Sequence, residues 1–367
     1  LEPWVQGAKY QLSESGLRYS LRQTLSFVGL SGVIQGDRSL EFYTLDWKSK
    51  WAVFSTARGG TAGWVSAQLE DKTGLNAHSE SQDASHNLGT LTDPTGLWSG
   101  VNGLRVPELA WQQSLREGEI VLVSGVLNQG NYLDQNSYAQ SGRSEFNNSA
   151  LIDNMVLPLT KYNFGLNLQW QPVKTWYTML GVSAGNNRAG FAPWTHFNLN
   201  TWSALGELGY APSDGLGLGP GIYRIQPFLA QADGPTQGGL GFDLQQQLGR
   251  HSPLGWFGRF GFGGEQVARG ASAQAGTGLV LHAPLKQLGL VPRLRNDLLG
   301  LGFVWSQPSA TSKTVYHQNE YVLETFYALQ LSPTLRLMPD LQFVWDPAFN
   351  SSHDQAAVFQ LQLVLGW

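Results

Sequence analysis

Ten charged residues fall at alternate positions of segments with the side-chain period of β-strands, on the polar side of each segment. Successive side chains of a strand point to opposite faces, so each of these residues shares a face with other polar groups. Carboxylates and guanidiniums on such a face can hydrogen-bond hydroxyl-bearing solutes as water leaves, or they can pair with one another and stiffen a wall. The candidate solute-contacting residues of a pore constriction are Arg18, Arg22, Glu108, Arg224, Asp243, Arg259, Glu320, Glu324, Arg336 and Asp340.

Two long polar segments, residues 70–105 and 128–160, interrupt this pattern. Loops of this length are uncommon in compact proteins and are often functional, so we expect both to fold toward the interior. The alternative is a pair of disordered surface loops. The side chains in the second segment that suit hydroxyl-rich solutes are those of Asn128, Tyr132, Asp134, Asn147 and Asn148.

No arrangement of residues predicts covalent chemistry. Glu320 and Glu324 stand four residues apart on one strand, about 13 Å by the rise per residue, which is too far for a pair of glycosidase carboxylates. We expect their partners on neighbouring strands instead. Residues 181–185 match the G-x-S-x-G pattern, but residues 186–190 read as a loop, where a nucleophile elbow needs a helix. The histidines show no H-E-x-x-H motif and no metal-like pairing. We therefore expect no enzyme activity, no metal site and no cofactor.

The composition limits the class of protein that could carry these residues. Charged residues are 14% of the 367 residues, against roughly 25% in an ordinary globular protein. The chain has no cysteine, which excludes disulfides and thiolate metal sites, and its net charge of −4 gives no electrostatic case for nucleic acid. No apolar run reaches the roughly 20 residues of a spanning helix, and no leader sequence opens the chain, so we expect any signal peptide to be absent or removed.

Sixteen segments alternate in the manner of β-strands. The last one has a continuous apolar face and ends on Trp367, as expected for a closing barrel strand with its ring at the membrane boundary. The register around residues 48–50 stays open. The predicted strands span residues 17–27, 40–54, 61–69, 106–115, 120–126, 162–170, 176–184, 201–210, 221–230, 239–248, 254–262, 272–282, 297–305, 319–331, 335–345 and 356–367.

The connections and faces of these strands favour a transmembrane barrel over a large soluble all-β protein. Short turns mostly alternate with longer loops, as in a barrel with turns at one rim, and no propeller motif repeats. Sixteen strands enclose a lumen too wide for side chains to fill. We therefore expect the bulky apolar faces, such as Tyr162, Phe164 and Leu166, to point to lipid and the polar faces to a watery lumen.

Several segments resemble those of the carbohydrate-selective porin family (OprB-like). Residues 320–343 resemble its C-terminal signature, in which a strand with two carboxylates four residues apart precedes a turn and a Pro-Asp-x-Gln-aromatic strand. Residues 295–302 look like its Arg-x-Asp-x-x-Gly-x-Gly strand opening, residues 16–21 like its first strand and residues 107–113 like its Glu-Leu-x-x-x-Gln strand. The resemblance implies a sixteen-stranded outer-membrane barrel that passes sugars by diffusion.

We therefore predict an all-β, transmembrane antiparallel β-barrel with short periplasmic turns and long extracellular loops. Residues 1–367 form a single domain that opens with a helix or turn at residues 1–16. Its expected role is a porin of the Gram-negative-type outer membrane for small hydrophilic solutes, with carbohydrates implied by the resemblance. The expected partners are membrane lipids and small sugars, and the chain is a monomer or a homotrimer. The alternatives are a loop-plugged structural or receptor barrel and a soluble all-β carbohydrate-binding protein.

Overall fold

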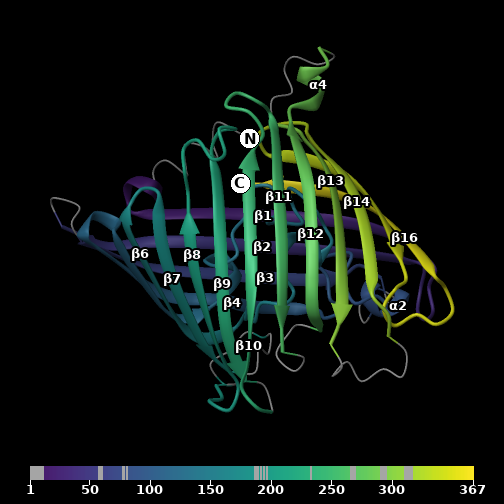
Figure 1. Ribbon diagram of the computed structural model, residues 1–367, viewed down its shortest axis with the longest axis horizontal. Helices are drawn as coiled ribbons and strands as arrows, with labels where there is room; N and C mark the ends of the chain where they lie inside the picture. Colours follow the sequence, from purple (N-terminus) through teal and green to yellow (C-terminus); the bar gives the residue numbers. More distant parts are fainter. Residues whose placement is uncertain are drawn as a thin grey trace.

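The computed structural model describes residues 12–56, 61–76, 79, 82–185, 190, 192, 195, 197–231, 234–264, 270–289, 296–309 and 317–367. These residues form sixteen strands that close into one antiparallel barrel, in which each strand pairs with its neighbours in the chain and β1 pairs with β16 (Figure 1). The predicted fold class and all sixteen predicted strands are confirmed. Most of the predicted N-terminal helix, residues 1–11, lies outside the described residues.

The strand bounds follow the alternating segments closely. The strands are β1 (Leu17–Ser31), β2 (Ser39–Ser55), β3 (Thr61–Gly74), β4 (Gly103–Leu115), β5 (Ile120–Leu127), β6 (Asn163–Val173), β7 (Trp176–Ala184), β8 (Trp202–Tyr210), β9 (Gly221–Gln231), β10 (Gln237–Gln247), β11 (Leu254–Gly263), β12 (Ala271–His282), β13 (Leu298–Pro308), β14 (Glu320–Gln330), β15 (Leu335–Trp345) and β16 (Gln355–Gly366). Each is at least nine residues long except β5, which has eight. A tilted strand of about 9–11 residues is long enough to cross a bilayer.

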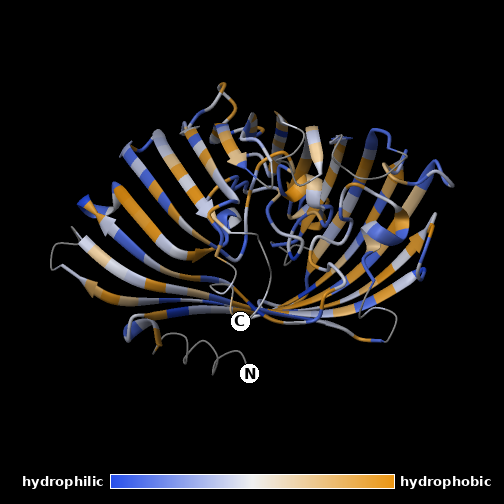
Figure 2. Ribbon diagram, turned by 90° about the horizontal axis from the view of Figure 1, so that it is seen from below, coloured by the Kyte–Doolittle hydropathy of each residue, from blue (hydrophilic) through white to orange (hydrophobic). Residues whose placement is uncertain are grey.

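The apolar faces of the strands form the outer surface of the barrel. In β16 the side chain of Phe359 is 51% exposed, whereas Gln360 and Gln362 on the opposite face are fully buried. The same alternation gives the striped strands of Figure 2. The predicted inversion, with apolar side chains outside and polar side chains inside, is therefore confirmed.

Two details of the predicted strands change. Tyr162 was expected on the outer face of its strand, but β6 begins at Asn163, and Tyr162 is buried with a left-handed φ of 64°. It therefore belongs to the loop that enters β6. The open register of β2 is continuous through Lys48 and Lys50, and a bulge follows between Ala52 and Phe54.

Two long connections lie inside the barrel (Figure 2). Inner loop 1, residues 75–102, joins β3 to β4 and contains the helix α2 (Ala84–Leu88). Inner loop 2, residues 128–162, joins β5 to β6 and contains η3 (Gln129–Asn131) and α3 (Ser149–Ile152). Among the described residues, no helix is long and apolar enough to cross a membrane.

The interior is less watery than predicted, because the inner loops bring an apolar core into the barrel. Trp98 of inner loop 1 stacks on Phe42 of β2, with ring centroids 5.3 Å apart. Phe146 of inner loop 2 meets Phe326 of β14 edge to face at 4.8 Å. A Cβ at Gly302 of β13 would lie 2.8 Å from the Phe146 ring, so only glycine lets the loop approach this closely. This packing fixes the loops against one part of the inner wall.

Candidate functional site

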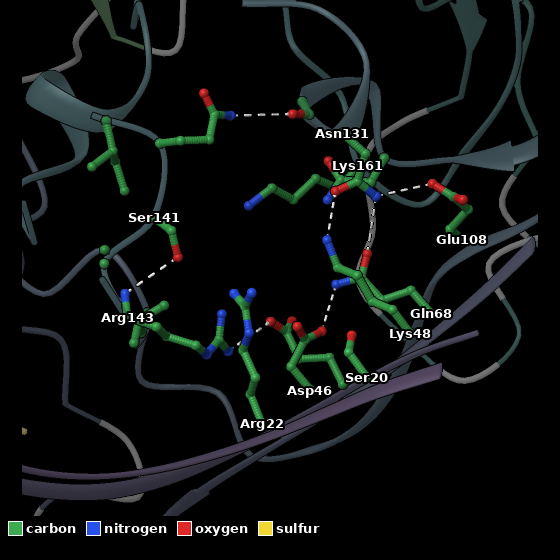
Figure 3. A pocket seen from close by; sticks show the side chains of 18 of the residues that line it. Ser20, Arg22, Asp46, Lys48, Gln68, Glu108, Asn131, Ser141, Arg143 and Lys161 are labelled. Carbon is green, nitrogen blue, oxygen red and sulfur yellow. Dashed lines mark hydrogen bonds and ion pairs between the residues drawn. The ribbon is translucent and has the colours of Figure 1, made fainter. Parts of the chain in front are cut away.

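A polar cavity of about 840 Å³ remains inside the barrel, between the inner faces of β1–β4 and the two inner loops. Its size falls in the usual range for small-molecule pockets, about 300–1,000 Å³. Charged and amide side chains from both sides point into it (Figure 3). The charged residues that line it include Arg18, Arg22, Asp46, Lys48, Glu108 and Arg143.

The strand side of the cavity consists of rows that run across neighbouring strands. Antiparallel pairing places Ser20 opposite Lys48, Lys48 opposite Gln68, and Gln68 opposite Glu108. Cross-strand partners on one face have Cβ atoms about 5 Å apart, so each row forms a continuous polar strip. The side chains of this row face the cavity because the alternation of each strand turns them inward and the register aligns them across the strands.

Glu108 joins this wall to inner loop 2. The Tyr132 hydroxyl donates to Glu108 Oε1 at 2.8 Å, and the Asn131 Nδ2 donates to Glu108 Oε2 at 2.9 Å. Lys48 Nζ donates to Asn131 Oδ1 at 2.9 Å. Two residues predicted separately from the sequence, Glu108 and Tyr132, are thus hydrogen-bonded to each other.

Arg143 reaches the same wall from the other side of inner loop 2. Its Nη2 lies 3.9 Å from Glu70 Oε1 and 3.4 Å from Thr44 Oγ1. The residue is 9% exposed, and its buried Nε has no hydrogen-bond partner among the described residues. Burying an unsatisfied donor opposes folding, so the Arg143 guanidinium has one N–H group that lacks an acceptor.

Arg18 and Arg22 lie on the inner face of β1 and line the cavity. Within the described part of the chain, neither guanidinium has a hydrogen bond or an ion pair. Arg22 stands opposite Asp46 in the β1–β2 register, but the Asp46 Oδ1 accepts instead from Gln68 Nε2 at 2.6 Å. Their donors therefore face the cavity.

Asp93 lines the cavity from inner loop 1. Burial, with a further contribution from the nearby Asp83 carboxylate, raises the pKa of Asp93 to about 6. Its Oδ1 accepts from the backbone N–H and the hydroxyl of Thr95, which favour the ionised form and limit the rise. The charge of the lining therefore depends on pH near neutrality.

Outside the cavity lining, Arg259 of β11 anchors inner loop 2. Its Nη1 donates to the carbonyls of Ala139 and Leu151, each at 2.6 Å, and its Nη2 donates to the carbonyl of Asp134 at 3.2 Å. The Nε lies 3.5 Å from Asp134 Oδ2. Arg259 is fully buried, so its hydrogen bonds hold the loop backbone in place.

A second group of charges continues this anchor along the wall. Asp243 of β10 stands opposite Arg224 in β9 and opposite Arg259 in β11, and it forms ion pairs with both. Arg224 also lies 3.5 Å from Glu207 Oε1, and Glu207 Oε2 accepts from the backbone N–H of Asp134 at 3.1 Å. These buried residues are partners of one another and of the loop.

Glu324 of β14 anchors another part of inner loop 2. Its carboxylate accepts the backbone N–H groups of Asn147 and Asn148. Asp340 of β15 lies beside it and accepts from Gln342 Nε2 at 3.0 Å. All of these residues are buried, so four predicted site residues, Glu324, Asp340, Asn147 and Asn148, form one loop anchor.

Glu320 holds inner loop 1 in the same way. Its oxygens accept from the backbone N–H groups of Leu91, Thr92 and Ala348 at 2.7–3.0 Å, and from the Thr92 hydroxyl at 2.6 Å. The sequence interpretation expected partners of Glu320 and Glu324 on neighbouring strands. The structure shows that their main partners are loop amides instead.

The predicted site residues therefore fall into two sets. Arg18, Arg22, Glu108, Asn128 and Tyr132 line the cavity. Arg336 lies between the sets, with Nε donating to Gln330 Oε1 at 3.0 Å and Nη1 to the Arg143 carbonyl at 3.3 Å. The buried anchors are Asp134, Asn147, Asn148, Arg224, Asp243, Arg259, Glu320, Glu324 and Asp340. Contact of either set with solute stays a prediction.

Sequence reasoning missed Lys48, Glu70 and Arg143 as cavity residues. Lys48 lies on the polar face of β2, but the sequence left the register around residues 48–50 open, so its face could not be assigned. By its sequence pattern Glu70 falls at the start of the long polar segment 70–105, after a predicted strand at residues 61–69, but β3 continues to Gly74. Arg143 is a single charge in a long polar segment, and no local pattern marks it.

Most of the chain matches a known protein family. Residues 55–239 and 234–365 match the family described as "Carbohydrate-selective porin, OprB family". Porin AaxA of Chlamydia abortus (strain DSM 27085 / S26/3) is 24% identical over 284 residues, which cover 75% of this chain. The match spans 61% of the length of that protein.

Solved structures share the same fold. The high-pH structure of Pseudomonas putida OprB superposes with a TM-score of 0.77 and 15% identity, covering 99% of this chain and 97% of the other. The outer-membrane protein OpdK of Pseudomonas aeruginosa gives a TM-score of 0.50 and 10% identity over 96% of this chain and 98% of its own. At these identities, the likeness establishes a barrel of the same kind.

Proposed function

This chain belongs to the carbohydrate-selective porin, OprB family, as a barrel of the outer membrane, and from that premise we propose that it admits small carbohydrates by passive diffusion. The solute passes through the polar cavity between β1–β4 and the inner loops. The family supplies the solute class, and the geometry of this chain supplies the route. No carrier movement or covalent step is needed.

The cavity of about 840 Å³ is the observation that carries the proposal. The apolar core packs the inner loops against other parts of the inner surface, so the polar cavity is the space that inner loop 2 leaves beside β1–β4. Its rows of amides, hydroxyls and charges can exchange hydrogen bonds with sugar hydroxyls as water leaves. We place the constriction of the cavity where Glu108 of the wall accepts hydrogen bonds from Tyr132 and Asn131 of inner loop 2.

The loop anchors support a fixed constriction. Arg259, Glu320 and Glu324 hold the inner loops through hydrogen bonds to backbone groups in the buried wall. A loop held at several buried points keeps a constant shape, which size selection requires. The second candidate, a barrel plugged by its loops, is favoured by the apolar core that the same loops build.

Two measurements separate these candidates. Purified protein in planar bilayers is expected to conduct ions, with a current that neutral sugars reduce, and proteoliposomes are expected to swell in monosaccharide solutions. Liposomes that contain heat-denatured protein are the control. Absent conductance together with unchanged swelling would favour the plugged barrel.

The remaining features belong to the same proposal. Residues 1–367 form one domain, with no enzymatic activity, and G-x-S-x-G at residues 181–185 is the end of β7. The chain works as a monomer or a homotrimer, in contact with membrane lipids. Chemical cross-linking in detergent and in native membranes measures the oligomeric state.

A further inference from the structure

The lining of the cavity has an excess of positive charge. Among the described residues, seven cationic and five acidic side chains line it, although the whole chain has a net charge of −4. The excess is concentrated on β1 and β2, where Arg18, Arg22, Lys48 and Lys50 face the cavity. Asp46 is the acidic residue that these two strands contribute to the lining. The local charge is thus opposite in sign to that of the protein.

The acidic groups are engaged within the protein. Glu108 accepts from Asn131 and Tyr132, and Asp46 accepts from Gln68. Glu70 lies 3.8 Å from Lys72 Nζ and 3.9 Å from Arg143 Nη2. A solute in the cavity therefore meets few free acceptors.

The cationic groups are less fully engaged. Arg18 and Arg22 have no ion pair or hydrogen bond within the described residues, and the buried Arg143 Nε is also without a partner. In Figure 3 the side chains of Arg22 and Arg143 point into the same space, one from the strand wall and one from inner loop 2. Arg143 is paired with the Glu70 carboxylate, whereas the Arg22 guanidinium beside it keeps its donors free for an anion.

We propose that this cavity prefers hydroxylated solutes that carry one anionic group, a carboxylate or a phosphate, and that Arg22 and Arg143 bind that group. The inference rests on the proposed porin function and names its solute class. The guanidinium forks of Arg22 and Arg143 suit planar carboxylates and phosphate oxygens, and the hydroxyl, ammonium, amide and carboxylate groups along the Ser20–Glu108 row exchange hydrogen bonds with the solute hydroxyls. A narrow cavity with walls of low dielectric focuses the field of these charges.

The test compares charged and neutral sugars in the same channel. Under a KCl gradient, the wild-type reversal potential is expected to have the sign of an anion-selective channel. Gluconate and glucose 6-phosphate are expected to reduce the current at concentrations about fivefold lower than glucose, the effect of one modest ion pair. The relative potency of the two anions distinguishes carboxylate from phosphate recognition.

Variants assign the effect to the proposed residues. Arg22→Gln and Arg18→Gln change side chains that face the cavity and anchor nothing, so folding is expected to be retained. Arg22→Gln is expected to shift the reversal potential toward cation selectivity and to abolish the advantage of gluconate over glucose. Arg250→Gln, which removes the same charge from an exposed turn, is the matched control.

Three results would overturn the inference: a wild-type channel without anion preference, equal blocking by glucose and gluconate, or an Arg22→Gln channel with an unchanged reversal potential. In each case continued glucose-driven swelling would leave the porin function intact. A protein that neither conducts nor supports swelling would refute both the function and the inference.

Discussion

The Nε of Arg259 lies 3.0 Å from the Oδ2 of Asp243, and neither side chain is exposed to solvent. The two residues stand opposite each other in the β10–β11 register, so the sheet itself sets their distance. The rest of the Arg259 guanidinium binds carbonyls of inner loop 2. One side chain therefore links the wall of the barrel to the loop that limits its cavity.

Arg259→Met is expected to release inner loop 2. It removes one of the two guanidiniums that pair with Asp243, the ion pair with Asp134 and the donors to three loop carbonyls, and loss of one partner of a buried ion pair costs about 3–5 kcal/mol. Limited proteolysis in detergent should cut within residues 128–162 in the variant only. Arg250→Met, on an exposed turn, is the control, and equal protease resistance of both variants would contradict the anchor.

Glu324→Ala is expected to increase single-channel conductance. The two backbone N–H groups of Asn147 and Asn148 lose their acceptor, at a cost of about 1–3 kcal/mol for each buried donor, and the loop shifts. Glu324→Gln keeps one acceptor oxygen, so its conductance should lie closer to that of the wild type than the conductance of Glu324→Ala does. Bilayer recordings compare the three proteins, and an unchanged conductance in Glu324→Ala would argue against this anchor.

Tyr132→Phe tests the link across the cavity. The hydroxyl donates to the Glu108 carboxylate, a hydrogen bond of about 1.5–3 kcal/mol, and its loss should loosen the loop beside the cavity. We expect weaker block of the ion current by glucose, measured in planar bilayers. Tyr210→Phe, on the exposed outer end of β8, should leave the block unchanged, and a parallel change in both variants would remove the special role of Tyr132.

Single cysteines can verify the orientation of β16, because the natural chain has none. Phe359→Cys is expected to react with a lipid-soluble maleimide in liposomes, since this side chain is 51% exposed on the outer face. Gln360→Cys should be protected, because Gln360 is buried inside. Reversed labelling of the two positions would contradict the barrel orientation.

Ion selectivity should depend on pH through Asp93. Its raised pKa of about 6 means that the carboxylate is ionised at pH 8 and mostly protonated at pH 5, so acidification removes a negative charge from the cavity. We expect anion preference to increase over this range, measured as a reversal potential, and Asp93→Asn to flatten the response. Asp354→Asn, exposed before β16, is the control.

The same shift has a defined effect on stability. The folded-state pKa of Asp93 lies above the ordinary value of 3.8, so its ionisation opposes the folded state. The contribution is fully present below about pH 3.8, falls as the pH rises above this value, and is lost once the pH exceeds about 6. Asp93→Asn is therefore expected to be no less stable than the wild type at pH 8, and a large loss of thermal stability there would contradict this.

The amino-acid sequence by itself determined the strands, their number and which face meets lipid. These are local properties, because side chains alternate with a period of two and the apolar face of each strand can be read from a few residues, as in Phe359 and Gln360. The terminal strand and the motif at residues 320–343 also indicated the family. The start of β6 moved by one residue, and the register of β2, which the sequence left open, came from the structure.

Only the tertiary structure decided what each inner residue does. By alternation, Arg22 and Glu324 are equivalent, because both stand on the polar face of a strand. Arg22 faces the cavity and Glu324 binds loop amides, because the path of inner loop 2 covers one part of the wall and leaves the other open. That path depends on contacts between residues more than a hundred positions apart, such as Arg259 with Ala139, and such contacts leave no periodic signal in the chain.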